Sequence, residues 1–504
     1  MKLKKRLCLL LALLMLAPTV VSCSDGADSG NGDTPTTSDS SDVSSDGTTD
    51  AETEEETEIS RENYPDTLPD GLDFGGATVN IHSRGDDQSY LEIGIEEMTG
   101  EPVNDAIYER NSMVEERLNV TLAPYRAEGW VDYNNAIASL RSSIMASDGA
   151  YDIIAGWSAR IPQLSLEGLM LDVLPLPYLD LEQPWWNQSA VEELEVANKL
   201  YFVTGNIAKT MTSAMYVFAF NKKLANDYEL ENLYDVVKEK RWTIDYVYDI
   251  SSAAYIDLNG DGKQNSGDSF GLVTSCINDA DSFMQGFHVS MISRDADGLP
   301  YLEVDTERMT TIVEKVYNLM WNNAGCISDT SGNTDITSFV EGRSLLATTR
   351  LETVATSFAE MEEDFGILPY PLLDETQEEY GTRVQDALSL WCIPIDAKNA
   401  EMSAAVLEAL AAQSYRTVTP AYFDVALKNR YSRDAETAEM MDLIQNSALI
   451  NFEQLYNESI GTPWFVLRLL MPAKNSNFAS YWAQNSKVIS KKLQLAVKQI
   501  QENG

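Results

Sequence analysis

The chain has 504 residues, of which 44% are apolar and 23% charged, a balance typical of folded globular proteins. It carries 79 acidic and 36 basic residues, a formal net charge of −43, so its surface repels phosphate backbones and excludes nucleic acid as a partner. Only two histidines occur, which excludes most histidine-based catalysis and metal binding, and no internal apolar run approaches the roughly 20 residues of a membrane-spanning helix.

The first 22 residues have the pattern of an export signal. A basic start at 2–6 precedes the apolar run 7–17, which is too short to cross a bilayer. The signal ends in Val-Val-Ser-Cys at 20–23, which resembles the bacterial lipoprotein box, in which the cysteine is lipidated and becomes the mature N-terminus. We therefore expect a palmitate-bearing lipid anchor at Cys23 and a location on the outer face of the cell membrane. The alternative is an ordinary signal peptide with an incidental cysteine.

A flexible tether is expected over residues 23–62. Residues 24–60 are rich in Ser, Thr, Gly and acids, with 12 acidic residues and no basic one. Such a segment cannot bury enough apolar surface to offset the entropy of ordering. A coil of this length reaches roughly 35 Å, enough to hold a domain clear of a lipid surface.

The cysteines indicate a protein that does not depend on disulfides. Cys8 lies in the signal and Cys23 is the expected lipidation site, which leaves Cys276, Cys326 and Cys392. Three is an odd number, so at most one disulfide can form, and buried free thiols are the favoured interpretation.

The rest of the chain, about 440 residues, exceeds the ~250–300 at which a single core stops growing, so two domains are expected. Strands expected at 77–83, 120–125 and 151–155 alternate with helices expected at 102–118 and 133–146. This order predicts a parallel sheet with right-handed crossovers.

The alternation continues along the chain. Further strands are expected at 200–204, 214–220, 271–274, 344–349, 365–368 and 387–393. Further helices are expected at 233–240, 244–255, 306–323, 400–413 and 481–500. The fold class is therefore α/β.

Three motifs lie within this order of elements. They are Tyr-Asp-Ile-Ile-Ala-Gly-Trp at 151–157, Val-Phe-Ala-Phe-Asn-Lys-Lys-Leu at 217–224 and Phe-Val-Glu-Gly-Arg-Ser at 339–344. With the lipoprotein box, they resemble the extracellular solute-binding proteins of bacterial ABC importers, in the sugar-binding group that includes maltose-binding protein. The resemblance covers about residues 75–504 and implies a two-lobe clamp of the periplasmic-binding-protein type II, with strands that cross the hinge.

The same resemblance implies how the chain divides and what it does. Lobe one would hold 75–210 and 329–386, and lobe two would hold 211–328 and 387–504. Closure of the lobes would bury a solute between them. No catalytic residue is expected, and the implied partners are a small carbohydrate and the permease subunits of an ABC transporter, with the protein itself a monomer.

Ligands of open α/β sheets lie beyond the carboxyl ends of the strands. Side chains at or just after such ends, or on an expected crossing strand, are Ser83, Arg84, Trp157, Ser158, Asn206, Arg350 and Trp391. The candidates are completed by Trp185 and Trp186, in the segment Gln-Pro-Trp-Trp-Asn at 183–187, and by Trp464, which follows a proline. The resemblance also implies stacking roles for Trp157 and Trp464.

The chemistry of these residues favours sugars. Aromatic rings stack on the apolar face of a pyranose, and Asp, Asn, Arg and Glu bond its hydroxyls. Any one tryptophan can instead belong to the core, as we expect for Trp242, Trp321 and Trp482. Arg84 can instead be a surface arginine that pairs with Asp86 or Asp87.

A twelve-residue segment matches the calcium loop of helix–loop–helix calcium sites. Its expected ligands are Asp257, Asn259, Asp261, the carbonyl of Lys263, Asn265 and Asp268, and Gly262 stands at the sharp turn. Asp268 replaces the usual glutamate, whose longer reach gives bidentate ligation. A structural Ca²⁺ is therefore expected, and the alternative is an Asp/Gly-rich turn without metal.

The favoured function is a lipid-anchored binding protein that captures a carbohydrate, most simply an oligosaccharide, for ABC import. One alternative is a binding protein for peptide or another polar solute. Another alternative, from a different class, is a surface glycoside hydrolase with two carboxylates. With 79 acidic residues, spacing alone does not decide between them.

Overall fold

The computed structural model describes residues 60–358, 361–423 and 435–503. The expected signal peptide (1–22), the expected lipidation site Cys23 and the expected tether (23–62) up to residue 59 lie outside the described residues. Residues 59–504 form one compact unit, which contains both large sheets.

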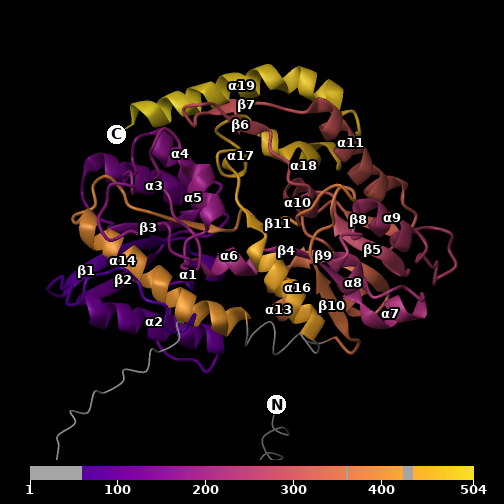
Figure 1. Cartoon of the computed structure of the whole chain (residues 1–504), viewed down its shortest axis with the longest axis horizontal. Coiled ribbons are helices and arrows are strands. Elements are labelled where there is room, and N and C mark those ends of the chain that lie inside the picture. Colours follow the sequence, from indigo (N-terminus) through magenta and orange to yellow (C-terminus); the bar gives the residue numbers. More distant parts are fainter. Residues whose placement is uncertain (1–59, 359–360, 424–434, 504) are drawn as a thin grey trace, which may run out of the picture. The chain divides into compact units, whose positions relative to one another are not determined.

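The first sheet has the strand order β12-β3-β1-β2, and β1, β2 and β3 lie on the left in Figure 1. Its strands are β1 (Ala77–Ser83), β2 (Val120–Arg126), β3 (Ile153–Trp157) and β12 (Ser389–Cys392). β1 pairs in parallel with β2 and β3, and β12 runs antiparallel to β3. Crossover helices α2 (Pro102–Leu118) and α3 (Tyr133–Ala146) confirm the predicted alternation.

The second sheet has the order β10-β4-β9-β5-β8 and lies on the right in Figure 1. Its strands are β4 (Tyr216–Asn221), β5 (Phe270–Ser275), β8 (Cys326–Asp329), β9 (Ser344–Arg350) and β10 (Phe365–Leu368). β5 is parallel to β8 and β9, whereas β4 is antiparallel to its two neighbours. The sheet is therefore mixed.

The remaining elements connect and cover these sheets. The helices are α1 (Asp87–Tyr90), α4 (Ile161–Leu166), α5 (Gln188–Leu194), α6 (Lys209–Ser213), α7 (Lys222–Asp227), α8 (Leu233–Lys238), α9 (Ile244–Ser252), α10 (Asn278–Gly286), α11 (Thr306–Tyr317), α12 (Thr337–Val340), α13 (Leu351–Thr356), α14 (Ala400–Gln413), α16 (Ala435–Asn446), α17 (Phe452–Leu455), α18 (Val466–Leu470) and α19 (Phe478–Glu502). Two short ribbons pair β6 (Ile292–Arg294) with β7 (Pro300–Leu302) and β11 (Thr382–Arg383) with β13 (Ala448–Leu449).

The strand partners correct the expected division into lobes. β9 and β10 were expected in lobe one, within 329–386, but they flank β4 in the second sheet. β12 was expected in lobe two, within 387–504, but it joins β3 in the first sheet. The reason is that the chain leaves the second sheet after β10 and crosses between β11 and β12, rather than crossing near 329. α14 follows β12 and packs on α2.

We call the parts of the molecule built around the first and the second sheet its two halves. These halves do not have separate cores, although two domains were expected. Alternate residues of β4 divide between two apolar clusters: Val217 packs in the cluster that contains the first sheet, whereas Phe218 and Phe220 pack in a cluster of the second half. Because successive strand residues point to opposite faces, one face of the second sheet shares its core with the first sheet. The two sheets are thereby joined by continuous apolar packing.

Smaller differences have local causes. Residues 200–204 form no strand, and Val203 makes only an isolated bridge to Trp391. The helix expected at 306–323 ends as α11 at Tyr317 and continues as a π-helical turn, Asn318–Asn322. Cys276, Cys326 and Cys392 are free and buried, as predicted.

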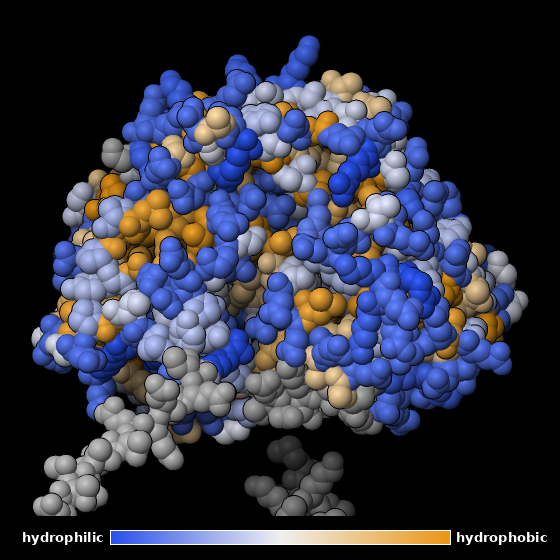
Figure 2. Space-filling model, in the orientation of Figure 1, coloured by the Kyte–Doolittle hydropathy of each residue, from blue (hydrophilic) through white to orange (hydrophobic). Residues whose placement is uncertain are grey.

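The face of the molecule drawn in Figure 2 is mostly polar. Hydrophilic residues cover most of the face in Figure 2, with apolar residues in smaller areas. No helix among the described residues is both long enough and apolar enough to cross a membrane.

Candidate functional site

Loops at the carboxyl ends of three strands of the first sheet meet in what we call the arginine–tryptophan cluster, which comprises Arg84, Trp130, Trp157 and Arg160. The guanidinium carbon of Arg84 lies 3.7 Å from the ring centroid of Trp130 and 5.8 Å from that of Trp157. The rings of Trp130 and Trp157 are 4.9 Å apart and perpendicular, at 89°. Arg160 lies 5.0 Å from the Trp157 ring. Cations over indole faces attract the ring quadrupole, so the cluster is mutually stabilising.

Polar partners fix the side chain of Arg84. Its side chain is fully buried, pairs with Asp86, donates to the Ser89 hydroxyl, and donates to the carbonyl of Ala387 at 3.1 Å. The alternative of a surface arginine is therefore wrong, although the expected pairing with Asp86 is present. One terminal nitrogen, Nη1, is buried without a hydrogen-bond partner.

Four charged side chains from the second half form what we call the ion-pair cluster. It comprises Asp281 of α10, Arg383 of β11, Asp386 of the crossing segment and Arg468 of α18. Arg468 Nε donates to Asp281 at 2.6 Å, and Arg383 Nη2 donates to Asp386 at 3.1 Å. Burial raises the pKa of Asp281 although the arginines oppose it, whereas for Asp386 the arginines outweigh burial and lower the pKa.

The crossing segment joins the two clusters into one junction. Ser158 at the end of β3 donates its hydroxyl to the carbonyl of Asp386 at 2.8 Å, next to the Ala387 carbonyl that Arg84 contacts. Residues of the first sheet thus contact the backbone of Asp386 and Ala387, while Arg468 of α18 contacts the side chain of Asp386.

Several unsatisfied polar atoms lie at or beside this junction. Those that are buried without a partner in the described part of the chain include Arg84 Nη1, Trp157 Nε1, Asp279 Oδ1, Asp281 Oδ1 and Arg383 Nε. Each such group costs about 1–3 kcal/mol when left unpaired. Burial also raises the pKa of Asp279 to about 7, against the hydrogen bonds from Thr348 and Thr334. A ligand with several hydroxyls can supply the missing partners.

The junction brings together Ser83, Arg84, Trp157 and Ser158 among the predicted residues. Arg350, at the end of β9, lies beside it: its Nη1 donates to Gln385 at 2.7 Å, one residue before Asp386. The rule of carboxyl ends thus predicted residues that lie close together, and their role in binding a ligand stays a prediction.

Three of the predicted tryptophans lie in the core instead. Trp185, Trp391 and Trp464 are each 0% exposed. The Trp185 ring packs beside the rings of Tyr64 and Tyr415, with centroids 6.2 and 6.3 Å away. Trp391 lies inside the first sheet on β12, and Trp464 packs in the cluster of the second half. Trp242, expected in the core, is also fully buried.

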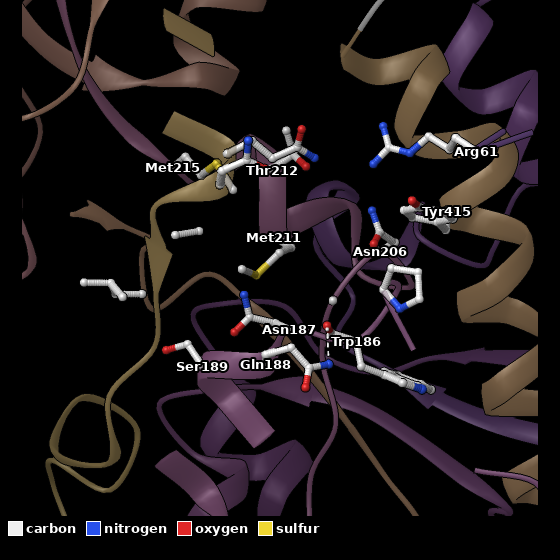
Figure 3. A pocket seen from close by; sticks show the side chains of 16 residues that line it. Arg61, Trp186, Asn187, Gln188, Ser189, Asn206, Met211, Thr212, Met215 and Tyr415 are labelled. Carbon is white, nitrogen blue, oxygen red and sulfur yellow. Dashed lines mark hydrogen bonds between the residues drawn. The ribbon is translucent and has the colours of Figure 1, made fainter. Parts of the chain in front are cut away.

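Trp186 and Asn206 line a different cavity, of about 480 Å³, which Figure 3 shows. Trp186 is 2% exposed and donates Nε1 to Glu408 at 3.0 Å, and Asn206 donates to the Thr419 hydroxyl at 2.7 Å. The other lining residues include Arg61, Tyr415, and residues of α5, α6, the end of α16 and β13, and none belongs to the junction. The predicted ligand residues therefore separate into the junction, this cavity and the core.

Trp130, Asp281, Asp386 and Arg468 are residues of the junction that the sequence did not reveal. The rule of carboxyl ends, applied to β2, could have found Trp130. Arg468 and Asp281 are 187 residues apart, and no local pattern signals a contact over that distance.

The expected calcium loop folds as tight turns. Asp257 accepts from the amides of Gly260 and Gly262 at 2.7 and 2.8 Å, and both glycines have positive φ, at 70° and 71°. Asp268 is fully buried and accepts from the amide of Asn265 at 3.0 Å. Over the described residues, no three His, Cys, Asp or Glu side chains form a group that could hold a metal ion. Calcium stays a prediction.

No protein-family model matches the chain, and no curated protein sequence matches it either. Among solved structures, a cyclo/maltodextrin-binding protein complexed with maltotetraose superposes with a TM-score of 0.51 at 12% sequence identity, over 85% of this chain and 97% of that chain. An ABC substrate-binding protein from Listeria monocytogenes in complex with cycloalternan also gives 0.51 at 12% identity, over 85% and 98% of the two chains.

The chain has the two-lobe fold of ABC substrate-binding proteins. The expected fold class is thereby confirmed. In this fold, the junction lies at the carboxyl ends of strands from the first sheet and beside α10, which follows β5 of the second.

Proposed function

We propose that the protein is an exported, lipid-anchored substrate-binding protein that captures a carbohydrate and delivers it to an ABC permease. The observation that carries the proposal is the junction, where unpaired buried polar atoms lie beside aromatic rings at the meeting of the two halves. Contacts that exist only when the halves are closed shift the population toward the closed form.

The chemistry of the junction fits a sugar. Trp130 and Trp157 offer flat apolar rings, and Arg84, Asp281 and Arg383 offer polar atoms that have no partner. A pyranose combines an apolar C–H face with a rim of hydroxyls and can use both kinds of group at once. The solved structures that share this fold hold maltotetraose and cycloalternan, which supports an oligosaccharide.

The charges of the junction favour a neutral ligand. Every arginine at or beside it already has a carboxylate partner; the pairs are Arg84–Asp86, Arg160–Glu458, Arg350–Glu352, and Arg383 and Arg468 with Asp281 and Asp386. An anionic ligand would have to displace one of these carboxylates. A neutral glycan needs no such exchange.

The anchor and the partners complete the proposal. Lipidation at Cys23, a tether that reaches away from the membrane and a monomeric binding domain are inferred from the sequence. Peptide or another polar solute is the second ligand class, because aromatic rings suit it too. Hydrolysis is the third possibility, tested by looking for products.

A thermal-shift screen of the purified protein against mono- and oligosaccharides tests the proposal, because a ligand raises stability with its concentration over its dissociation constant. Chromatography of each binding sugar after incubation tests turnover. A melting-temperature rise with unchanged sugar is expected. No response to any glycan but a response to peptides, or cleaved sugar, would contradict the proposal.

A further inference from the structure

The cavity of about 480 Å³ in Figure 3 is lined by residues of both halves and is separate from the junction. Tyr415 lines it from the π-helical turn Ser414–Val418, which follows α14 of the first half. Gln445 and Asn446 line it from the end of α16, which packs on α8 and β10 of the second half. Small-molecule sites commonly have volumes of about 300–1,000 Å³, so the cavity is large enough for a ligand of the size of a dipeptide.

Arg61 carries the only charge among the described residues that line this cavity. Its guanidinium carbon lies 4.5 Å from the centroid of the Tyr415 ring, and Figure 3 shows both side chains on the same side of the cavity. This cation–π contact holds the charge in place. Arg61 has no carboxylate partner in the part of the chain that the structure describes, in contrast to Arg84 and Arg383 at the junction. The cavity therefore offers a positive charge that no acidic side chain of its lining neutralises.

The segment that carries Arg61 is fixed by contacts of its neighbour Tyr64. The carbonyl of Tyr64 accepts from Arg416 Nε at 2.8 Å. The Tyr64 ring packs against the rings of Trp185 and Tyr415, with centroids 6.2 and 6.1 Å away. Tyr415 and Arg416 belong to the π-helical turn, and such turns are frequent at functional sites. The same turn therefore presents Tyr415 to the cavity and holds the segment of Arg61 beside it.

The rest of the lining combines unused hydrogen-bonding groups with apolar ones. The side chains of Thr212, Gln445 and Asn446 make no hydrogen bond to another described residue. Met211 and Met215 add flexible apolar surface, which adapts to ligand groups of different shape. A ligand in this cavity can use a negative charge, polar groups and an apolar body at once.

We propose that this cavity is a second ligand site, which binds a small organic monocarboxylate with an apolar body, such as the carboxyl-terminal end of a short peptide. A planar carboxylate matches the paired N–H donors of the Arg61 guanidinium, and such charge-assisted pairs are among the stronger hydrogen bonds. The amide side chains of Gln445 and Asn446 can both donate to a peptide group and accept from it.

The charge of the site selects a monoanion. One arginine compensates one negative charge, so a phosphate dianion would leave a charge uncompensated in a protein of net charge −43. The site goes beyond the proposed function, because it shares no residue with the junction.

Calorimetric titration of the purified protein with leucyl-leucine, its carboxyl-terminal amide, hexanoate and glucuronate tests the proposal. The free dipeptide should bind at least about tenfold more tightly than its amide, because the amide cannot form the charge-assisted pair. Tighter binding of the dipeptide than of hexanoate assigns the carboxylate to a peptide, and the reverse order assigns it to an acyl chain; either result supports the site. Glucuronate, whose body is polar, should bind more weakly than both.

The variant Arg61→Gln should bind the free dipeptide at least about tenfold more weakly than the wild type and bind the amide equally well. Arg241→Gln is the matched control, because Arg241 does not line the cavity and its charge is paired with Glu231 and Glu239. This control should bind both forms of the dipeptide as the wild type does. Circular dichroism shows whether the variants keep the fold.

Three results would overturn the proposal: no binding of any carboxylate by the wild type, equal affinity of the wild type and Arg61→Gln for the free dipeptide, or glucuronate as the tightest ligand. A sugar titration into Arg61→Gln separates this proposal from the proposed function. Unchanged sugar affinity supports a second site, whereas weakened sugar binding would place the sugar in this cavity and overturn the second site. Dipeptide binding that depends on Arg61, in a protein that binds no sugar, would support this site and contradict the proposed function alone.

Discussion

Arg84 is the buried cation that contacts most of the other groups of the arginine–tryptophan cluster, and replacing it should lower the free energy of unfolding. Arg84→Leu keeps a side chain of apolar bulk but deletes the pairing with Asp86 and the hydrogen bonds to Ser89 and Ala387. The Arg84 side chain is 0% exposed and that of Asp86 11%, so water cannot replace the lost partner of the carboxylate. Breaking a buried pair in this way costs about 3–5 kcal/mol.

Urea unfolding monitored by tryptophan fluorescence measures this loss as a change in the free energy of unfolding. Most of the cost is the unpaired carboxylate, so the double variant Arg84→Leu/Asp86→Asn should recover a large part of it, because the amide side chain introduced at position 86 can still cap α1. Arg241→Leu is the control. Its partners Glu231 and Glu239 have side chains 48% and 59% exposed, and exposed pairs contribute less than about 1 kcal/mol. A loss below about 1 kcal/mol for Arg84→Leu would show that the pairing is not what holds the junction.

Three further predictions concern pH, thiols and calcium. Burial raises the pKa of Glu453 to about 7, above its value in the unfolded chain, so the contribution of Glu453 to stability is full below about pH 4.5 and is lost as pH rises toward 7. The variant Glu453→Gln should therefore gain stability relative to the wild type between pH 5 and pH 8, measured by urea unfolding. An equal stability difference between variant and wild type at both pH values would refute this. Burial raises the pKa of the Cys276 thiol to about 11 and that of Cys326 to about 12, so a thiol reagent such as DTNB should label neither in the native protein and both after unfolding, and rapid native labelling would contradict the buried assignment. We propose that the 257–268 loop binds a structural Ca²⁺; added calcium should raise the melting temperature relative to chelator and do so less in Asp257→Ala, whereas identical melting curves would leave the loop as a turn without metal.

The sequence predicted the parts of the fold that depend on local pattern. Apolar periodicity placed α2 and α3 correctly, and the motif at 217–224 fell on β4 and α7. The prediction of which sheet each strand joins was wrong for β9, β10 and β12, because the sequence of a short buried strand has the same apolar pattern in either sheet. Only the register of its partners, such as Trp391 with Ala155, distinguishes the sheets.

The residues of the candidate site were likewise predictable only where they depend on local pattern. Arg84 and Trp157 were predictable, because the carboxyl end of a parallel strand is both a sequence feature and a place in space. The burial of Trp464 and Trp185 was not predictable, since whether an indole is covered depends on chain segments far away, such as Tyr415 beside the Trp185 ring. In the ion-pair cluster, Arg383 and Asp386 are three residues apart, but Asp281 and Arg468 are 187 residues apart, and no local pattern signals their contact.

Calorimetric titration of one binding sugar into the wild type, Trp157→Ala and Asp281→Asn tests most directly whether one ligand touches both halves of the molecule. Trp157 belongs to the first sheet and Asp281 to the helix after β5. We expect each variant to weaken binding by about tenfold, or 1.4 kcal/mol, while circular dichroism shows that the sugar-free variants keep the fold of the wild type. Loss of affinity in only one folded variant, or in neither, would place the ligand elsewhere and contradict a sugar held between the two halves.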